Sequence, residues 1–295
     1  MQESTNIHEK TDCDAMLFWM ITDSCNFSCY QCVAQAKKLD GQWVSEKVKI
    51  AGLKRFLGKL SKPVLFQITG GEPLLVENII EVLQEVTKKH YLFLISNLVS
   101  PRVKELADTI DPARVNAFMA SAHMQELEKR DLLKTFISHC ILLREKGFTV
   151  SVVEVAYPFQ LHAVNRYRKI FSDYGIELQF EPFRGIWDNK RYPDAYTEEE
   201  LRLIEPKKYL PLSLDNYKRK GKLCNAGYNI AVVGKKGKIN PCFFIDENMG
   251  TINRSIRFRK YMRICPFESC RCPFPVFFPA FYEKALANPH LTIKK

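Results

Sequence analysis

Six short apolar segments alternate with amphipathic helical segments, and this alternation constrains the fold more than any other feature of the chain. The apolar segments span residues 15–22, 64–68, 91–95, 115–120, 148–156 and 176–180. Between them, apolar residues recur at helical spacing over residues 48–60, 76–86, 101–110, 127–146 and 161–174. Strands that alternate with helices in this way form parallel βαβ units with right-handed crossovers. The sequence therefore predicts an α/β fold with a parallel sheet, whose ligand side lies beyond the carboxyl ends of the strands.

Glycine and capping residues predict where two of the helices end or begin. Gly147 follows the long helical segment 127–146, at a position where glycine commonly terminates a helix. Thr197 and Glu200 have the spacing of a capping box, which predicts a short helix near residues 198–204.

Three cysteines follow the first predicted strand on a single loop: Cys25, Cys29 and Cys32. Thiolates this close in sequence can converge on one metal centre, since soft sulfur ligands favour iron–sulfur clusters and zinc. Structural zinc sites usually draw their ligands from two separated pairs, so the spacing favours an iron–sulfur cluster. A four-iron cluster held by three thiolates keeps one iron open to a small molecule, which indicates a site for chemistry.

A glycine-rich turn follows the second predicted strand: Gly70, Gly71, Glu72 and Pro73. Glycines lack a Cβ atom and so let a ligand approach the backbone closely. The Glu72 carboxylate could pair with a ligand's ammonium group, and Pro73 ends the strand. Taken alone, such a turn is more often a plain connection between a strand and a helix than a binding site.

The cysteine loop and the glycine-rich turn together resemble the radical S-adenosylmethionine (SAM) superfamily, whose signature is a Cys-x3-Cys-x2-Cys loop after the first strand and Gly-Gly-Glu-Pro after the second. The resemblance covers residues 16–184 in outline and implies a partial (β/α)6 barrel. It also implies that the loop cysteines ligate a [4Fe–4S] cluster and that Gly70, Gly71 and Glu72 hold the SAM ammonium group. Reductive cleavage of SAM would then give a 5′-deoxyadenosyl radical that removes a hydrogen atom from a substrate.

The resemblance also implies further contacts to SAM. The family commonly has an aromatic residue directly before the third cysteine, near the adenine, whereas this chain has Gln31 there and Tyr30 one position earlier. Tyr30 is therefore the candidate for the adenine contact. Ser96 and Asn97 end the third strand on the ligand side and are candidate SAM contacts as well. His123, after the fourth strand, is either a contact to the ribose region or an ordinary loop histidine.

Two carboxylates are candidate catalytic residues. Glu154 interrupts the apolar fifth strand, and Glu181 lies at the end of the sixth. A carboxylate that points into a barrel is costly to bury alone, so it tends to be paired or functional. Each could contact substrate or take a proton after hydrogen abstraction, or could instead form a salt bridge with Arg184 or another base.

A second group of cysteines follows the predicted barrel: Cys224, Cys242, Cys265, Cys270 and Cys272. Residues 230–240 read as two strand-like segments joined by a glycine-bracketed turn, and such a hairpin would bring Cys224 and Cys242 together. This segment resembles the SPASM and Twitch domains of radical SAM enzymes. The resemblance implies one auxiliary [4Fe–4S] cluster held by four of the five cysteines, with a structural zinc site as the alternative.

The remaining cysteines have simpler interpretations. Cys140 shares the apolar face of its helix and is expected in the core. Cys13 lies in a polar segment and is expected to be a surface thiol, with hydrogen-atom donation to a substrate radical as the alternative. Together the motifs divide the chain into an N-terminal extension (1–14), the barrel (15–185), a bridge (186–222) and an auxiliary-cluster domain (223–295).

Composition excludes several classes of protein. The 295 residues are 46% hydrophobic, ample for a large core, yet they contain no run of about eighteen apolar residues that would predict a transmembrane helix. Residues 1–14 are polar and carry acids, unlike a signal or transit peptide. Ten cysteines without a secretory signal indicate a reducing compartment and metal ligation, so we expect a cytoplasmic protein.

The surplus of positive charge, formally +11, is clustered along the chain. Basic clusters occur at residues 88–89, 207–208, 218–220, 235–236 and 254–263. They are read either as the solvated face of a basic protein or as a surface that attracts a phosphorylated or acidic substrate. No recognisable nucleic-acid module accompanies them, so a nucleic-acid partner is not expected.

The sequence thus predicts a radical SAM enzyme, an oxidoreductase that removes hydrogen from a small sugar-like or phosphorylated substrate for dehydrogenation or epimerisation. It would need an electron donor such as flavodoxin or ferredoxin. The first alternative is a peptide-modifying maturase, made less favoured because few residues precede the first strand. The second is a non-catalytic iron–sulfur or zinc protein that binds nucleic acid.

Overall fold

The computed structural model describes residues 13–30, 32, 37–38, 46–206, 218–268 and 279–287. Its strands are β1 (Ala15–Thr22), β2 (Ser24–Cys25), β3 (Lys37–Lys38), β4 (Val64–Gly70), β5 (Tyr91–Ser96), β6 (Val115–Ser121), β7 (Val150–Ala156), β8 (Leu178–Pro182), β9 (Gly185–Trp187), β10 (Lys190–Tyr192), β11 (Leu223–Cys224), β12 (Ile230–Val233), β13 (Lys238–Asn240), β14 (Gly250–Thr251), β15 (Ser255–Ile256) and β16 (Arg263–Ile264). Its helices are α1 (Ile50–Leu57), α2 (Ile79–Thr87), α3 (Arg102–Thr109), α4 (Met124–Lys129), α5 (Leu133–Glu145), α6 (Val164–Ser172), α7 (Glu198–Ile204) and α9 (Pro279–Leu286).

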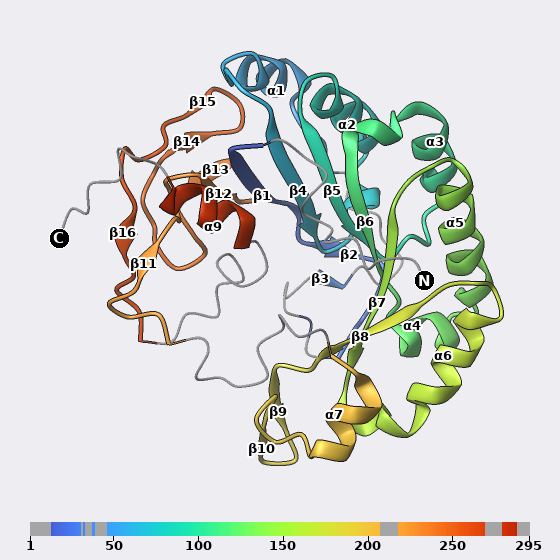
Figure 1. The fold of residues 1–295 in the computed structure, drawn as a ribbon. Coiled ribbons are helices and arrows are strands. Elements are labelled where there is room, and N and C mark those ends of the chain that lie inside the picture. The colour runs from blue at the N-terminus through green and yellow to red at the C-terminus, as the bar shows by residue number, and fades with distance from the viewer. Residues whose placement is uncertain are drawn as a thin grey trace.

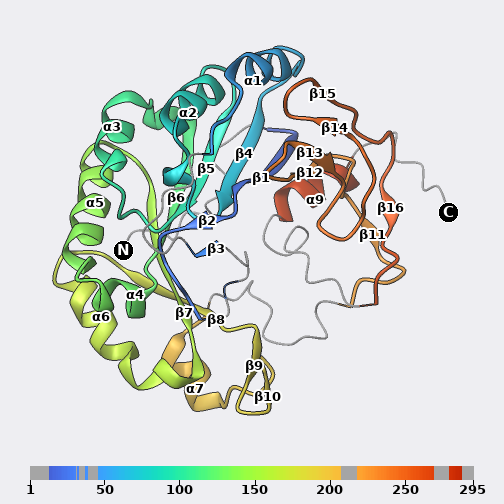
Figure 2. The same ribbon diagram turned by 180° about the vertical axis from the view of Figure 1, so that it is seen from behind.

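One curved sheet organises the molecule. Its strand order is β15-β14-β13-β12-β1-β4-β5-β6-β7-β8, and the neighbours from β1 to β8 are all parallel. Helices α1, α2, α3, α5 and α6 lie along the outer face of this sheet (Figures 1 and 2). Six parallel strands with helices on one face confirm the predicted partial (β/α)6 barrel.

The sheet buries apolar side chains on both faces, because successive residues of a strand point to opposite sides. Phe66 of β4 and Phe118 of β6 belong to the main core, which also contains the buried faces of the outer helices. Leu65 and Phe93 belong to a second, smaller core with residues of the C-terminal part. The barrel strands therefore read as apolar runs in the sequence, as buried parallel strands do.

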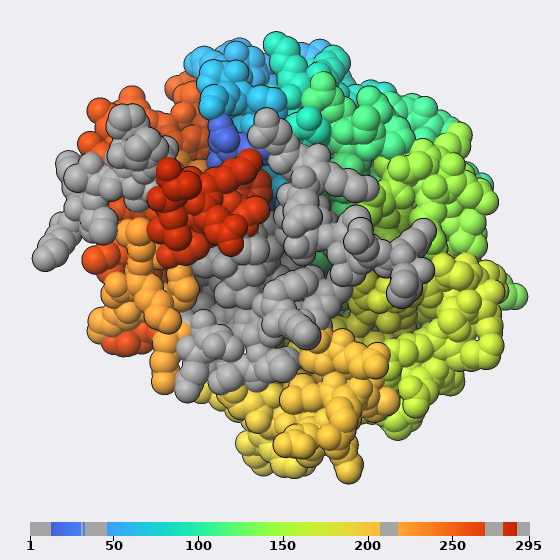
Figure 3. Space-filling view, viewed as in Figure 1, coloured from blue at the N-terminus to red at the C-terminus, as the bar shows by residue number. Residues whose placement is uncertain are grey.

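The C-terminal part extends the barrel sheet. Strand β12 pairs parallel with β1, Met16 with Ile230, and the antiparallel strands β13 to β15 follow at the sheet edge. The predicted hairpin at residues 230–240 is thus confirmed. Helix α9 contributes Phe281 to the second core, and the space-filling view shows it (red) next to the N-terminal elements (blue) (Figure 3). The domain boundaries expected from the sequence stay predictions.

The helix predicted over residues 127–146 is two helices, α4 and α5. Asp131 between them has φ of 55°, a left-handed conformation that a continuous right-handed helix does not accommodate. The N–H of Leu132 donates to the carbonyl of Leu127 at 2.9 Å and closes the first helix. Aspartate adopts this conformation more readily than most residues, and apolar periodicity alone does not reveal the break. The predicted end of the second helix at Gly147 is correct, with φ of 87° there.

The bridge between barrel and C-terminal part begins with a short hairpin, β9 and β10, which the sequence did not predict. Helix α7 follows and begins with the expected capping box between Thr197 and Glu200. In the part of the chain that the structure describes, no helix has the length and apolar character needed to cross a membrane.

Candidate functional site

The three loop cysteines lie beyond the carboxyl end of β1. Cys25 is buried, whereas Cys29 and Cys32 are half-buried. Phe27 belongs to the main core, and its N–H lies 3.4 Å from the Cys25 sulfur. The loop is therefore anchored at its first cysteine, and its second and third cysteines are closer to solvent.

Gly70 and Gly71 bring the end of β4 into backbone contact with the cysteine loop. A Cβ atom on Gly70 would lie 2.2 Å from the carbonyl oxygen of Thr22, and one on Gly71 would lie 2.1 Å from that of Ser24. The N–H of Gly71 donates to Thr22 at 2.9 Å, and that of Glu72 donates to Ser24 at 2.8 Å. The two motifs therefore form one structural unit, in which a side chain at either glycine would clash with backbone atoms.

The carboxylate of Glu72 ties this unit to the end of β5. It is 1% exposed and accepts hydrogen bonds from Ser96 Oγ (2.7 Å), the N–H of Asn97 (2.8 Å) and the N–H of Leu74 (2.9 Å). Burial raises the pKa of Glu72, and these hydrogen bonds oppose the rise. Pro73 opens the short 3₁₀ helix that follows. The expected contacts of Glu72, Ser96 and Asn97 with SAM stay predictions.

Asn26 extends the same network to the first cysteine, a role that sequence reasoning missed. Asn97 Nδ2 donates to Asn26 Oδ1 at 2.8 Å, and the Cys25 sulfur lies 3.9 Å from that oxygen. The buried carboxylate of Glu72 thus positions Asn97, and Asn97 positions the residue next to Cys25. Its place between the first two cysteines is the one sequence signal that could have pointed to Asn26.

The cysteine loop lies among carboxylates. Burial raises the pKa of Cys25 to about 12, with added repulsion from Glu72, Cys32 and Glu126. Burial also raises the pKa of Cys29, with repulsion from the other two thiols, Glu126 and Glu154. Bound cations reverse this effect and hold thiolates deprotonated. In these surroundings the thiols would therefore become thiolates only with a bound metal centre.

The residues present fit a cluster ligated by one thiolate per iron. Within residues 13–30, 32, 37–38, 46–206, 218–268 and 279–287, no three His, Cys, Asp or Glu side chains are grouped so as to hold one metal ion. A four-iron cluster binds each thiolate to a different iron, so its ligands stand further apart than those of a single ion. Three mutually interacting thiols on one loop and the nearby carboxylates suit a cluster with a cationic ligand.

Tyr30 lies in an aromatic group beside the cysteines. Its ring makes edge contacts with Tyr157, Phe159 and Trp187 at centroid distances of 5.8, 5.4 and 5.5 Å. Tyr157 also donates its hydroxyl to the carbonyl of Tyr30 at 2.7 Å. These contacts fix the loop between its second and third cysteines, next to an open depression of about 690 Å³. The adenine contact of Tyr30 stays a prediction, and Gln31 lies outside the described residues.

Glu154 was expected to point into the barrel, but its side chain lies on the other face of β7. It shares its face of β7 with Val152 and Ala156, which belong to the main core on the helix side of the sheet. Its carboxylate accepts the N–H of Met124, at the start of α4, at 2.9 Å. Burial raises its pKa to about 8. This orientation depends on the register of the strand, and one acidic residue in an apolar segment does not determine that register.

A small pocket nonetheless joins Glu154 to the cysteine loop. Cys29, His123, Glu154 and Gln160 line it, and the buried Oε1 of Gln160 has no hydrogen-bond partner in the described part of the chain. His123 has φ of 41° at the start of α4 and contacts Phe27 through its ring. The catalytic role suggested for Glu154 stays a prediction.

Glu181 lies on the inner face of the barrel, near the end of β8. It forms the salt bridge with Arg184 that was expected as an alternative, at 3.8 Å. Gln179, two residues earlier on the same face, accepts a hydrogen bond from Ser151 of β7 at 3.2 Å. Gln67 of β4 is a further inner-face residue that sequence reasoning missed; its buried Oε1 has no partner among the residues described.

Three of the five C-terminal cysteines come together at the second core. Cys242 and Cys265 belong to that core, and Cys224 packs against it. Strands β11 and β16 pair so that Cys224 lies opposite Arg263, two residues before Cys265. Cys224 and Cys265 therefore lie diagonally across the two strands, on the same face. Cys270 and Cys272 lie outside the described residues. The auxiliary ligand set stays a prediction.

Cys13 is not the surface thiol that its polar neighbours suggested. It is 1% exposed and belongs to the second core. Its carbonyl accepts a hydrogen bond from Lys284 of α9 at 2.8 Å. The pairing of β1 with β12 brings this N-terminal residue against the C-terminal part, a long-range contact that local composition does not reveal. Cys140 is fully buried in α5, as expected.

No family model matches the chain, and neither does any curated protein. Solved structures do match. The enzyme anSMEcpe with bound AdoMet is 16% identical with a TM-score of 0.54, over 81% of this chain and 77% of that chain. SuiB of Streptococcus suis, bound to its precursor peptide SuiA, is 14% identical with a TM-score of 0.52, over 81% of this chain and 62% of SuiB. This chain has the fold of radical SAM enzymes. The expected fold class is thereby confirmed.

Proposed function

We propose that this chain is a radical SAM enzyme. The observation that carries the proposal is the backbone contact between the cysteine loop and Gly70-Gly71, in a fold shared with anSMEcpe bound to AdoMet. A cluster that only stabilised the fold would need a fourth ligand, whereas this loop offers three thiols surrounded by carboxylates. A purely structural zinc or iron–sulfur protein that binds nucleic acid does not account for this arrangement.

Each part of the site has a defined task under this proposal. When bound, a [4Fe–4S] cluster and SAM supply a 5′-deoxyadenosyl radical that removes a hydrogen atom from the substrate. Cys25, Cys29 and Cys32 would hold the cluster, and the backbone at Gly70 and Gly71 would bind the amino acid end of SAM. The network from Glu72 through Asn97 to Asn26 orients the loop for both. The aromatic group around Tyr30 would hold the loop in place between its second and third cysteines.

The inner face of β7 and β8 supports a small polar substrate. Ser151, Gln179, Glu181 and Arg184 offer hydrogen-bond donors, acceptors and both signs of charge within a short distance of one another. Such a surface suits the hydroxyl or phosphate groups of a sugar-like molecule. We therefore propose dehydrogenation or epimerisation of such a substrate, with Glu181 as the candidate proton acceptor on the inner face.

A peptide is the second candidate substrate, favoured by the comparisons. SuiB was solved with its precursor peptide, and anSMEcpe with AdoMet and the Kp18Cys peptide is 16% identical to this chain, with a TM-score of 0.51 over 81% of this chain and 77% of that chain. The auxiliary cluster that we propose at Cys224, Cys242 and Cys265, completed by Cys270 or Cys272, is compatible with either substrate. A reduced flavodoxin or ferredoxin would supply electrons.

Anaerobic reconstitution tests the proposal. Wild-type protein, SAM and dithionite should yield 5′-deoxyadenosine and methionine, and the variant Cys25→Ala/Cys29→Ala/Cys32→Ala should yield neither. Iron should fall from about eight to about four atoms per chain in the variant, since only the auxiliary cluster remains. Zinc in place of iron, or intact SAM in the wild-type reaction, would refute the enzyme and support a metal-binding module.

The substrate class is tested separately. The assay follows deuterium transfer into 5′-deoxyadenosine from deuterated sugar phosphates and from deuterated peptides. Transfer from a sugar phosphate would support the first candidate, and formation of the dehydrogenated or epimerised product that is lost in Glu181→Gln would support Glu181 as the proton acceptor. Transfer from peptides alone would replace it with the second.

A further inference from the structure

One edge of the C-terminal part carries a dense group of positive charges. Residues 218–222 and 254–263 contain nine Lys or Arg and no Asp or Glu. The two segments, which we call the basic edge, lie side by side because Leu223 pairs with Ile264 and Cys224 with Arg263. Figure 1 shows this edge at the opposite margin of the sheet from helices α5 and α6. A surface with this much charge of one sign attracts acidic macromolecules over a distance.

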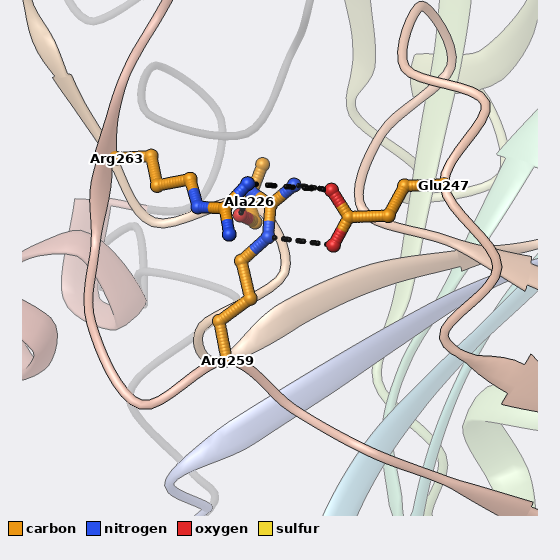
Figure 4. A network of polar contacts seen from close by, with 4 residues as sticks. All are labelled: Ala226, Glu247, Arg259 and Arg263. Atoms are coloured by element: carbon orange, nitrogen blue, oxygen red, sulfur yellow. Dashed lines mark hydrogen bonds and ion pairs between the residues drawn. The ribbon is translucent and has the colours of Figure 1, made fainter. Parts of the chain in front are cut away.

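Nearby acids neutralise only part of this charge. Arg259 donates two hydrogen bonds to the carboxylate of Glu247, and Arg263 lies 3.5 Å from the same group (Figure 4). Arg259 also donates to the carbonyl of Ala226 at 3.1 Å, which fixes the segment against the turn before β12. Lys220 pairs with Glu268.

Four exposed cations of the basic edge make no ion pair with any residue in the described ranges: Lys222, Arg254, Arg257 and Lys260. Ions held in internal salt bridges contribute little to attraction of a partner, whereas solvated cations contribute fully. Ile264 is also 42% exposed, but it pairs with Leu223 and therefore projects to the other side of the ladder from Lys222 and Arg263. The solvated cations are thus the feature that would steer the encounter with a partner protein.

The basic edge also lies against the thiols of the predicted auxiliary cluster. The N–H of Cys265 donates to the carbonyl of Lys222 at 2.9 Å, so these two residues face each other across the ladder. Arg263 faces Cys224 in the same way. Residues opposite each other in an antiparallel pair project to the same side. A protein docked at the basic edge is therefore adjacent to the two cysteines.

We propose that the basic edge is the docking surface for an acidic electron-carrier protein of the flavin or iron–sulfur class. The inference rests on the proposed function, because only a redox enzyme needs such a carrier beside its auxiliary site. The occupant follows from two properties of one surface: solvated positive charge and direct proximity to the thiols of the predicted auxiliary cluster. Phosphate-bearing polymers match the first property alone.

The experiment measures binding of a fluorescently labelled flavodoxin to the reconstituted full chain by anisotropy, at low and at physiological ionic strength. The test variant is Lys222→Glu/Arg254→Glu/Arg257→Glu/Lys260→Glu. The control variant is Lys59→Glu/Lys89→Glu/Lys104→Glu/Lys134→Glu, which changes net charge equally at exposed positions on the barrel. We expect the dissociation constant to rise at least about tenfold in the test variant and less than about twofold in the control. Circular dichroism melting curves of both variants verify folding.

Two results would overturn the proposal. Equal weakening in both variants would show that net charge, not the basic edge, attracts the flavodoxin. Tighter binding of a single-stranded DNA oligonucleotide, lost only in the test variant, would assign the edge to nucleic acid instead. Failure of the proposed function gives a different signature: wild-type protein would leave SAM intact with dithionite, which needs no carrier, while flavodoxin still binds at the basic edge.

Discussion

Replacing Gly71 by alanine perturbs the contact between the two motifs most directly. The added Cβ would lie 2.1 Å from the carbonyl oxygen of Ser24, far inside any normal contact distance. That oxygen also accepts the N–H of Glu72 at 2.8 Å, so it cannot move away without weakening this hydrogen bond. Overpacking costs about 1–3 kcal/mol and a lost hydrogen bond about 1 kcal/mol. We therefore expect Gly71→Ala to lower the free energy of unfolding by about 2–4 kcal/mol and to displace the cysteine loop.

Urea unfolding of the protein without iron measures the first effect, and iron per chain after reconstitution measures the second. Gly234→Ala is the matched control, because its Cβ would meet nothing closer than the carbonyl of Lys238 at 3.9 Å. The control should change the free energy of unfolding by less than about 0.5 kcal/mol and retain iron. If Gly71→Ala matched Gly234→Ala in both measurements, the proposed unit of loop and turn would be wrong.

Three further changes test the surroundings of the site and the core. Asn97→Ala removes the hydrogen bond to Asn26, so it should lower the free energy of unfolding in urea by about 1 kcal/mol and lower the iron content per chain. An unchanged iron content would exclude a positioning role for Asn97. Glu72 accepts three hydrogen bonds, and Glu72→Gln replaces one acceptor oxygen by an NH₂ donor, which should lower the free energy of unfolding by about 1–3 kcal/mol. A variant as stable as the wild type would contradict the network. Burial lowers the pKa of His90 to about 4, and its Nδ1 accepts the N–H of Val64. Below its usual pKa of about 6.5 the unfolded chain binds a proton at His90 that the folded chain excludes, so the contribution of His90 to stability should fall by about 2 kcal/mol from pH 7 to pH 5. Because Glu154, with its raised pKa, acts in the opposite direction, the measured quantity is the difference in free energy of unfolding between wild type and His90→Gln. That difference should change by about 2 kcal/mol over this range, and a constant difference would refute the assignment.

The barrel could be predicted because its strands and helices have strong local signals. Buried parallel strands are continuously apolar, and the outer helices bury residues at regular helical spacing, so each element can be recognised from its own residues. The break between α4 and α5 was missed because it depends on one residue, Asp131, in a left-handed conformation within an otherwise helical pattern.

The candidate site was predictable where chemistry and spacing are local, and not where long-range pairing decides. The loop cysteines and Gly70-Gly71 each lie within a few residues of one another, so their motifs were visible. The burial of Cys13 depends on the pairing of β1 with β12, more than two hundred residues apart in the chain. The orientation of Glu154 depends on the register of β7, because a shift of one residue exchanges the two faces of a strand. The local sequence determines neither the burial of Cys13 nor the orientation of Glu154.

The central claim is that the cysteine loop holds a cluster with an iron open to SAM. Electron paramagnetic resonance spectra of the reconstituted, dithionite-reduced protein, recorded before and after addition of SAM, test it most directly. The account predicts that SAM changes the wild-type spectrum, and that Cys25→Ala/Cys29→Ala/Cys32→Ala retains only a signal that SAM leaves unchanged. A wild-type spectrum indifferent to SAM, or an equal response in the variant, would contradict it.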